Sequence, residues 1–360
     1  MREKALEYAH LACKTMMNKF EAPQLPPVYG FHYHAGVFLS GMMKLYELCG
    51  DEKYLKYTKD WVDSVIVEDG VIRFAKGSID DYMAGILLFP LYERYSEKRY
   101  MTVLLLFKTI IRNWLCNEKG GFWHKEWYPD QMWLDGLYMA GPLQAMFTQY
   151  FNEPYFLDNA AKQAILMYEN MQDKNTKLLY HGWDCSRVVG WADKETGLSK
   201  EFWGRALGWY VVAMLDILEL MPKTHPEYEK LIAIEKEVLE AVLTYQCPKS
   251  GMWYQLVDKV ADPKNWIETS CSCLFVYAAA KAIRMNIIDR KHMETVKRGF
   301  EGILSHSVKK EGDNIILGGT CIGTSVCEYE EYITRPTSDN DLHGMGAFLL
   351  MCVELAKTKE

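Results

Sequence analysis

The sequence contains no long apolar segment. Its apolar runs, such as VLLLF at residues 103–107, are far shorter than the roughly 20 residues that cross a bilayer, so we expect no membrane segment. Residues 1–20 carry charges among their apolar side chains and lack the continuous apolar core of a signal peptide. These absences indicate a protein that is neither secreted nor embedded in a membrane, and we expect it in the cytoplasm.

Signatures of metal, nucleotide and redox sites are also missing. The ten cysteines lie far apart, and Cys271 and Cys273 match neither a CxxC motif nor a zinc knuckle, so we expect reduced thiols. No HExxH, GxGxxG, P-loop or GxSxG motif occurs, and we expect neither a metal nor an organic cofactor. With 41 basic and 48 acidic residues, the net charge of −7 provides no basic surface for nucleic acid.

The sequence is rich in helical periodicity, with apolar residues recurring at i, i+3 and i+4. Twelve helices are predicted near residues 3–20, 35–48, 52–68, 79–97, 99–117, 131–150, 154–172, 202–221, 226–246, 268–285, 289–305 and 340–357. Short connections alternate with the long segments 21–34, 69–78, 118–130, 173–201, 247–267 and 306–339. Because short links join antiparallel neighbours, this alternation predicts six helical hairpins.

Counted along the chain, the even-numbered helices are apolar almost all round, whereas the odd-numbered helices carry a charged stripe, so the even-numbered helices are expected inside. Small residues such as Gly36, Gly136 and Gly208 occur in their first turns, as expected where helix ends crowd together. These features predict an all-α fold, an (α/α)6 barrel forming a single domain over residues 1–360. No fixed repeat supports an open helical solenoid. All long loops would then meet at one mouth, which the inner helix N-termini make favourable to anions.

Aromatic residues concentrate in the long loops and in the helical turns that follow them. Eight of the eleven tryptophans lie there, namely Trp123, Trp127, Trp133, Trp183, Trp191, Trp203, Trp209 and Trp266. Aromatic rings alternating with His, Asp and Arg predict a sugar-sized site with stacking surfaces. The alternative is a packed aromatic plug, since large aromatic side chains are common in cores.

Two aspartates are the leading candidates for acid–base chemistry. With Asp130 as the expected N-cap, Asp135 is the fifth residue of its helix, too far along to cap it. Desolvation would raise its pKa and the helix N-terminus would lower it; if desolvation prevails, Asp135 is a general acid. Ser78 and Asp81 form a predicted capping box, which leaves Asp80 for a second carboxylate role. Alternatively, Asp135 pairs with an Arg or Tyr and Asp80 is a first-turn acid favoured by the helix dipole.

Basic side chains near the aromatic segments are candidates for substrate binding. Arg205, between Trp203 and Trp209, is placed to bind a substrate carboxylate, or alternatively to pair with one of the two aspartates. His124 and His181 lie beside aromatic residues in long loops, where they either donate to the substrate or are structural.

Five segments in order along the chain resemble the unsaturated rhamnogalacturonyl hydrolases of glycoside hydrolase family 105. They are HKEWYP (124–129), QMWLDGLYMAGP (131–142), YHGWD (180–184), FWGRALGWY (202–210) and GTSVCEY (323–329). The unsaturated glucuronyl hydrolases of family 88 are related and share the two-aspartate arrangement, but YHGWD and FWGRALGWY look more like family 105.

The resemblance implies an (α/α)6 barrel that releases 4-deoxy-4,5-unsaturated galacturonic acid from the non-reducing end of unsaturated rhamnogalacturonan oligosaccharides, without a cofactor. The partner would be this small saccharide, and the protein a monomer or small homo-oligomer. By resemblance, Asp135 is the catalytic acid/base and Asp80 the second site aspartate. The implied substrate contacts fall on His32, Tyr33, His124, Lys125, Tyr128, His181, Trp203, Arg205 and Trp209.

Other functions on the same fold stay open from the sequence. One is an unsaturated glucuronyl hydrolase acting on glycosaminoglycan disaccharides, and another is a sugar epimerase or isomerase that uses histidine pairs. A conventional glycosidase with saturated substrates and a non-catalytic sugar-binding protein complete the alternatives.

Overall fold

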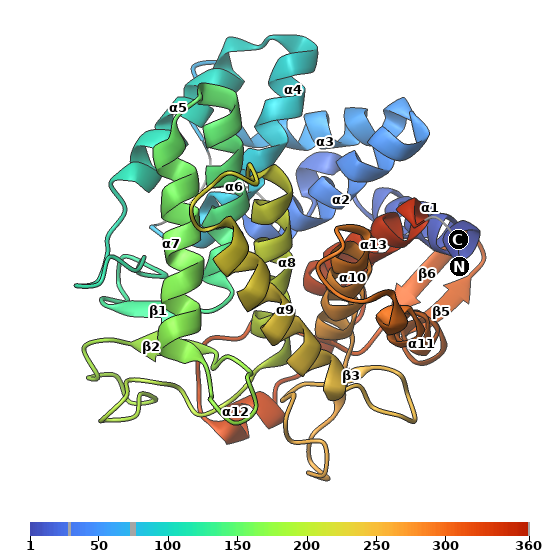
Figure 1. Ribbon diagram of the computed structural model, residues 1–360. Helices are drawn as coiled ribbons and strands as arrows, with labels where there is room; N and C mark the ends of the chain where they lie inside the picture. The colour runs from blue at the N-terminus through green and yellow to red at the C-terminus, as the bar shows by residue number, and fades with distance from the viewer. Residues whose placement is uncertain (28–29, 73–76, 359–360) are drawn as a thin grey trace.

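The computed structural model describes residues 1–27, 30–72 and 77–358, and most of its regular structure is helical (Figure 1). The predicted loops 21–34 and 69–78 each include residues outside these ranges. The inner helices are α2 (Tyr33–Cys49), the 3-10 segment η3 (Met83–Leu87) continued by α4 (Leu88–Tyr95), α6 (Gly136–Phe151), α8 (Gly204–Leu220), α10 (Thr269–Arg284) and α13 (Leu342–Lys357). The outer helices are α1 (Arg2–Lys19), α3 (Glu52–Val65), α5 (Lys98–Arg112), α7 (Pro154–Met171), α9 (Tyr228–Thr244) and α11 (Met293–His306).

The inner helices form a closed ring. Each packs against the next, from α2 through η3, α6, α8 and α10 to α13, and α13 packs back on α2. Each inner helix from α2 to α10 also packs against the outer helix that follows it in the chain, and α1 packs on α13, so the first and last helices of the chain make the sixth pair. Figure 1 shows the two chain ends side by side at this point. The predicted (α/α)6 barrel is thereby confirmed.

Two inner helices begin later than predicted. In the predicted helix 79–97, two 3-10 turns, η2 (Ile79–Asp81) and η3, precede α4, which begins at Leu88. Pro90 lacks a backbone N–H, and it falls in the first turn of α4, where no such donor is required. The predicted helix 131–150 begins at Gly136, because residues 131–133 form a strand instead.

Four two-stranded antiparallel sheets lie in the long loops. They pair β1 (Gln131–Trp133) with β2 (Gly182–Asp184), β3 (Trp253–Tyr254) with β4 (Ile267–Glu268), β5 (Val308–Glu311) with β6 (Asn314–Leu317), and β7 (Thr320–Cys321) with β8 (Thr337–Ser338). A short helix, α12 (Tyr329–Ile333), lies in the last long loop. In Figure 1, β1, β2, β3 and α12 gather at one end of the helices α6 to α9.

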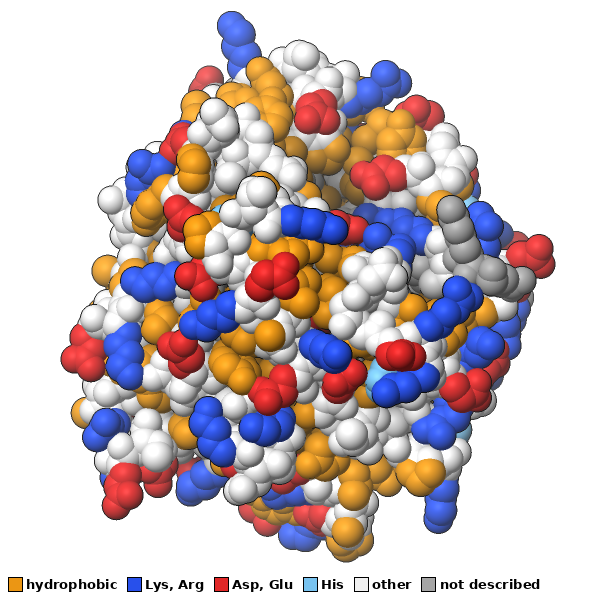
Figure 2. All heavy atoms as spheres, in the orientation of Figure 1, with side chains coloured by type: hydrophobic (Ala, Val, Ile, Leu, Met, Phe, Trp, Pro, Cys, Tyr) orange, Lys and Arg blue, Asp and Glu red, His pale blue; other side chains and the backbone are white. Residues whose placement is uncertain are grey.

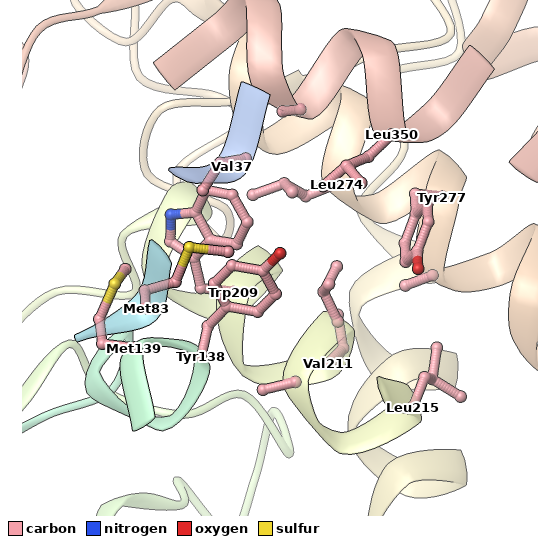
Figure 3. Packing of buried hydrophobic residues seen from close by; sticks show 14 of the residues in the cluster. Val37, Met83, Tyr138, Met139, Trp209, Val211, Leu215, Leu274, Tyr277 and Leu350 are labelled. Atoms are coloured by element: carbon pink, nitrogen blue, oxygen red, sulfur yellow. The ribbon is translucent and has the colours of Figure 1, made fainter. Parts of the chain in front are cut away.

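The core lies inside the ring. Residues Leu342 to Ala356 of α13 are all buried, as expected for an inner helix. Figure 3 shows Val37, Met83, Tyr138 and Trp209, from four different inner segments, converging near the ring centre. Close approach between helices needs glycine here, since a Cβ at Gly36 would lie 2.8 Å from the Cβ of Ala84.

The surface carries both charge signs. On the face shown in Figure 2, Lys and Arg side chains are interspersed with Asp and Glu, without a field of one sign. All ten cysteines are free. Within the described ranges, no helix combines the length and apolar character needed to cross a membrane.

Candidate active site

Asp80 is positioned by a local turn. The predicted capping box is present, since Ser78 Oγ accepts from the Asp80 N–H and Asp81 Oδ2 accepts from the Ser78 N–H. Asp81 is thus used in the cap, as predicted. The segment around Ser78 also pairs with the following loop, because the Ile79 N–H donates to the His124 carbonyl at 3.2 Å and Ser78 pairs with Lys125 in a β-bridge. This pairing brings His124 and Lys125 beside Asp80.

The Asp80 carboxylate faces two basic groups. Its Oδ1 lies 3.3 Å from His124 Nε2 and its Oδ2 lies 3.9 Å from Lys125 Nζ. Burial opposes ionisation, but His124, His32 and Lys125 lower the pKa of Asp80 far below its ordinary value. Asp80 is therefore an anion at neutral pH. Its Oδ1 and the Nδ1 of His124 are buried without a hydrogen-bond partner among the described residues.

Asp135 lies directly before α6, as its N-terminal flanking residue, and makes no capping hydrogen bond. The expectation that it is the fifth helical residue is wrong, because Asp130 has a left-handed backbone (φ 61°) and β1 follows it. The β1–β2 pairing aligns Trp133 with Gly182, and the Leu134 N–H donates to the His181 carbonyl at 2.8 Å. Two residues far apart in sequence, Asp135 and His181, are thereby brought face to face.

Asp135 and His181 form a second carboxylate–imidazole pair. Asp135 Oδ1 lies 3.6 Å from His181 Nε2, and both atoms are buried without a hydrogen-bond partner among the described residues. Burial raises the pKa of Asp135, but the imidazoles of His181 and His124 outweigh it and the pKa is lowered. Desolvation therefore does not prevail, and Asp135 is not a general acid in the free protein. Burial lowers the pKa of His181, despite Asp135, so this imidazole is neutral.

Tyr332, which the sequence did not single out, sets the proton position on His181. Its hydroxyl lies 2.6 Å from His181 Nδ1 and accepts from the Cys327 N–H at 3.2 Å. Since the Asp135 carboxylate that faces Nε2 of His181 can only accept, Nδ1 is left as the acceptor and the Tyr332 hydroxyl donates to it. The proton of neutral His181 then lies on Nε2, facing Asp135.

Aromatic rings surround the two pairs. Trp133 stacks on His124 at 4.5 Å between ring centroids and on Tyr128 at 5.2 Å, and Lys125 Nζ lies 5.4 Å from the Trp133 centroid. Trp133 is almost fully buried, so it orients these neighbours. The sequence placed Trp133 among the mouth aromatics but not in the site itself.

Arg205 and Trp203 lie on the other side of His181. The Trp203 ring is 4.6 Å from the His181 ring, and the Arg205 guanidinium is 4.6 Å from the Trp203 centroid. Arg205 pairs with neither aspartate. It donates to the carbonyls of Cys321 and Ile322 at 2.5 and 2.7 Å, and so holds the last long loop over the mouth.

Trp209 is not brought together with the other predicted residues. Its side chain is 1% exposed and stacks on Tyr138 with ring centroids 4.4 Å apart, inside the core (Figure 3).

His32 and Tyr33 begin α2. Their ring centroids are 4.7 Å apart. Burial lowers the pKa of His32, against the effect of the Asp80 charge. Burial also raises the pKa of Tyr33, against the effect of the Arg205 charge. The Tyr33 hydroxyl is hydrogen-bonded to the ring of His343, which in turn is hydrogen-bonded to Asp341; neither His343 nor Asp341 was predicted from the sequence. Their position at the start of an inner helix, where Asp135 and Tyr33 also lie, was the available signal.

No group of three or more His, Cys, Asp or Glu side chains in the described parts of the chain is placed to hold a metal ion. What the arrangement offers is two carboxylate–imidazole pairs with unused hydrogen-bonding atoms, enclosed by aromatic rings at the N-terminal ends of inner helices. Such a site can bind an anionic sugar and move protons.

The chain is similar to glycoside hydrolases along nearly its full length. The model of Glycosyl Hydrolase Family 88 matches residues 8–359. Among curated proteins, the unsaturated rhamnogalacturonyl hydrolase YesR of Bacillus subtilis is 25% identical, over 92% of this chain and 91% of that protein.

Solved structures agree. A family 105 glycoside hydrolase from C. acetobutylicum ATCC 824 is 32% identical, with a TM-score of 0.93 over 97% of this chain and 99% of that chain. The unsaturated glucuronyl hydrolase from Bacillus sp. GL1 shares the fold, with a TM-score of 0.73 at 14% identity over 99% of this chain and 97% of that chain. The protein is therefore a glycoside hydrolase of the Glycosyl Hydrolase Family 88 group, and it belongs within that group to family 105, as its motifs indicate.

Proposed function

We propose that this enzyme hydrolyses unsaturated rhamnogalacturonan oligosaccharides and releases the 4-deoxy-4,5-unsaturated galacturonic acid at their non-reducing end. The observation that carries the proposal is the pair of aspartates, Asp80 and Asp135, each facing an imidazole with unused hydrogen-bonding atoms. The similarity to YesR supports the choice of a galacturonyl unit joined to rhamnose.

The reaction begins with protonation of the sugar double bond. The C4=C5 bond is an enol ether, so a proton delivered to C4 by Asp135 draws on the π electrons and leaves an oxocarbenium ion at C5. Asp135 then accepts a proton from water, whose oxygen bonds to C5. The resulting hemiketal opens, and the aglycone leaves through rearrangement. One residue can thus act first as acid and then as base.

Asp135 must carry a proton when the substrate is bound, although its pKa is lowered in the free protein. The uronate carboxylate supplies this change, because a nearby negative charge and the loss of water both raise a carboxyl pKa. Asp80, held as an anion by His124 and Lys125, stabilises the positive charge that develops at C5.

Substrate binding uses the positive groups and the rings at the mouth. Lys125, with a side chain 21% exposed, and the inner helix N-termini attract the uronate. Arg205 adds charge but is occupied by loop carbonyls, so we assign it to shaping the mouth as well as to binding. Tyr128, Trp203 and the histidines offer polar edges and ring surfaces for the sugar.

The test is the ultraviolet absorbance of the C4=C5 bond when the purified protein meets unsaturated galacturonyl-rhamnose. Unsaturated chondroitin and heparin disaccharides and a saturated galacturonyl-rhamnose serve as parallel substrates. We expect absorbance to fall with the first substrate alone. A fall only with the glycosaminoglycan disaccharides would move the enzyme to the glucuronyl hydrolases, and cleavage of the saturated sugar would contradict the double-bond chemistry.

A further inference from the structure

We propose that Asp341 and His343 are positioning residues that fix Tyr33 as a hydrogen-bond acceptor for a hydroxyl group of the uronyl substrate. The inference rests on the proposed function, because it gives Tyr33 a sugar ligand. It adds two residues from the start of the last inner helix to the site.

The three side chains form a continuous hydrogen-bonded row. Tyr33 Oη lies 2.6 Å from His343 Nε2, and His343 Nδ1 lies 2.6 Å from Asp341 Oδ1. Asp341 is the N-cap of α13, and the same Oδ1 accepts from the His343 backbone N–H at 2.9 Å. The Asp341 carboxylate therefore holds both the backbone and the ring of His343, and this ring reaches from α13 to the start of α2.

The direction of each hydrogen bond follows from chemistry. A carboxylate only accepts, so the proton of the His343 ring is on Nδ1 and is donated to Asp341. Burial and the charge of Arg205 lower the pKa of His343 to about 4, against the effect of Asp341, so the ring is neutral at neutral pH. Nε2 then carries a lone pair, and Tyr33 must donate its hydroxyl proton to it.

Tyr33 consequently offers only lone pairs to the mouth. His343 is 3% exposed, whereas Tyr33 is partly exposed, so Tyr33 is the member that is open to a ligand at this end. An acceptor-only oxygen binds a sugar hydroxyl and repels a carboxylate or a ring oxygen. The row therefore orients the sugar by its hydroxyl edge and directs the uronate away from Tyr33.

The chain provides a matched control for the capping role of Asp341. Asp51 caps α3 in the same way, accepting from the backbone N–H two residues on, at Lys53, but it lies outside the mouth. Asp341→Ala and Asp51→Ala each remove one cap, so both are expected to reduce stability, and Asp341→Ala the more because it also removes the acceptor of the His343 ring.

The kinetic test uses the full-length enzyme and unsaturated galacturonyl-rhamnose. We expect Tyr33→Phe and His343→Gln each to lower kcat/KM about tenfold, the effect of one lost hydrogen bond. Because His343 acts through Tyr33, the double variant should be no worse than Tyr33→Phe. Asp341→Ala should lower kcat/KM and Asp51→Ala should leave it unchanged. Multiplied losses in the double variant, or equal losses in the two capping variants, would overturn the proposal.

A second measurement separates this proposal from the proposed function. Nitrogen NMR of the His343 ring in the free wild-type enzyme needs no substrate, and we expect a proton on Nδ1 and none on Nε2 at neutral pH. A proton on Nε2 would overturn the acceptor role of Tyr33 even if turnover is observed. If no unsaturated uronide is consumed while the NMR result is as expected, the proposed substrate fails and the hydrogen-bond direction stands.

Discussion

The two ends of the helix ring both bury charged side chains, but they satisfy them differently. At the C-terminal ends of the inner helices, Lys281 Nζ lies 2.5 Å from Asp216 Oδ1 and 2.6 Å from Glu219 Oε2. Arg284 bridges Glu219 at 2.9 Å and Glu354 at 2.5 Å. This end is a closed network of opposite charges.

At the mouth, the buried charges keep unused atoms. Asp80, Asp135, His124 and His181 each have one buried side-chain atom without a hydrogen-bond partner in the described parts of the chain. Unsatisfied buried groups cost free energy, so a fold retains them where a ligand completes them. Burial of charge alone therefore does not mark a site, whereas a cluster of buried groups with unsatisfied hydrogen-bonding capacity does.

A substitution of Asp135 at the mouth is expected to have the largest effect on turnover. Asp135→Asn removes the proton donor with almost no change of volume, so we expect turnover of unsaturated galacturonyl-rhamnose to fall about a thousandfold or more. Circular dichroism and the melting temperature should match the wild type. A variant that keeps near-wild-type rates would remove Asp135 from the mechanism.

Removing an ion pair at the closed end should lower the stability of the protein and leave its kcat unchanged. Lys281→Met leaves the Asp216 carboxylate without its ion-pair partner, while Glu219 keeps Arg284, and we expect a loss of about 3 to 5 kcal/mol in the free energy of unfolding. The remaining folded enzyme should keep its kcat. Lys4→Met, which breaks an exposed pair with Glu301, is the control and should cost less than about 1 kcal/mol. Equal losses in the two variants would show that the closed end is not specially dependent on pairing.

A smaller effect is expected from the residue that orients a mouth imidazole. Tyr332→Phe removes the hydroxyl proton donated to His181 Nδ1, which allows the other tautomer, and we expect kcat/KM to fall about tenfold. Tyr329→Phe is the control on the same short helix, where the hydroxyl binds Asp262 away from the pairs. A similar fall in both variants would assign the effect to the loop instead of the tautomer.

Glu235 is a single buried carboxyl outside both charged ends of the ring. It is fully buried, has no hydrogen-bond partner in the described ranges and lies on α9. Burial raises its pKa well above the ordinary value, so the folded protein holds a proton that the unfolded chain releases. The stabilising effect of this proton is complete below the unfolded pKa and is lost as pH rises toward the folded pKa.

Urea unfolding of the wild type and Glu235→Gln at several pH values tests this sign. The stability of the variant relative to the wild type should rise by about 1.4 kcal/mol per pH unit above the unfolded pKa of Glu. A difference that is independent of pH would mean that Glu235 is ionised in the folded protein.

The ring could be predicted because helical periodicity and loop lengths are local signals. The strand at 131–133 could not, because its three residues gain their hydrogen bonds from β2, about fifty residues later in the chain. That one pairing explains why Asp135 was placed inside a helix instead of before it.

The site was predicted to the extent that its residues flank helix starts and aromatic segments. Asp80, Asp135, His124 and His181 were singled out in this way, and the structure brings them together as two carboxylate–imidazole pairs. Arg205 was singled out as well, but its hydrogen bonds to the Cys321 and Ile322 carbonyls depend on the course of a loop over a hundred residues away. The links of Tyr332 to His181 and of His343 to Tyr33 depend on the same kind of long-range closure.

The pairing of α1 with α13 sets the order in which the ring can be completed during synthesis. The buried face of α1 includes Tyr8, Ala9 and Ala12, and its main helical partner is the last helix of the chain. At about 5 to 20 residues per second, the ribosome takes tens of seconds to produce the helices between them. The first helix therefore waits with its apolar face uncovered, and we expect ring closure to be a late step in folding.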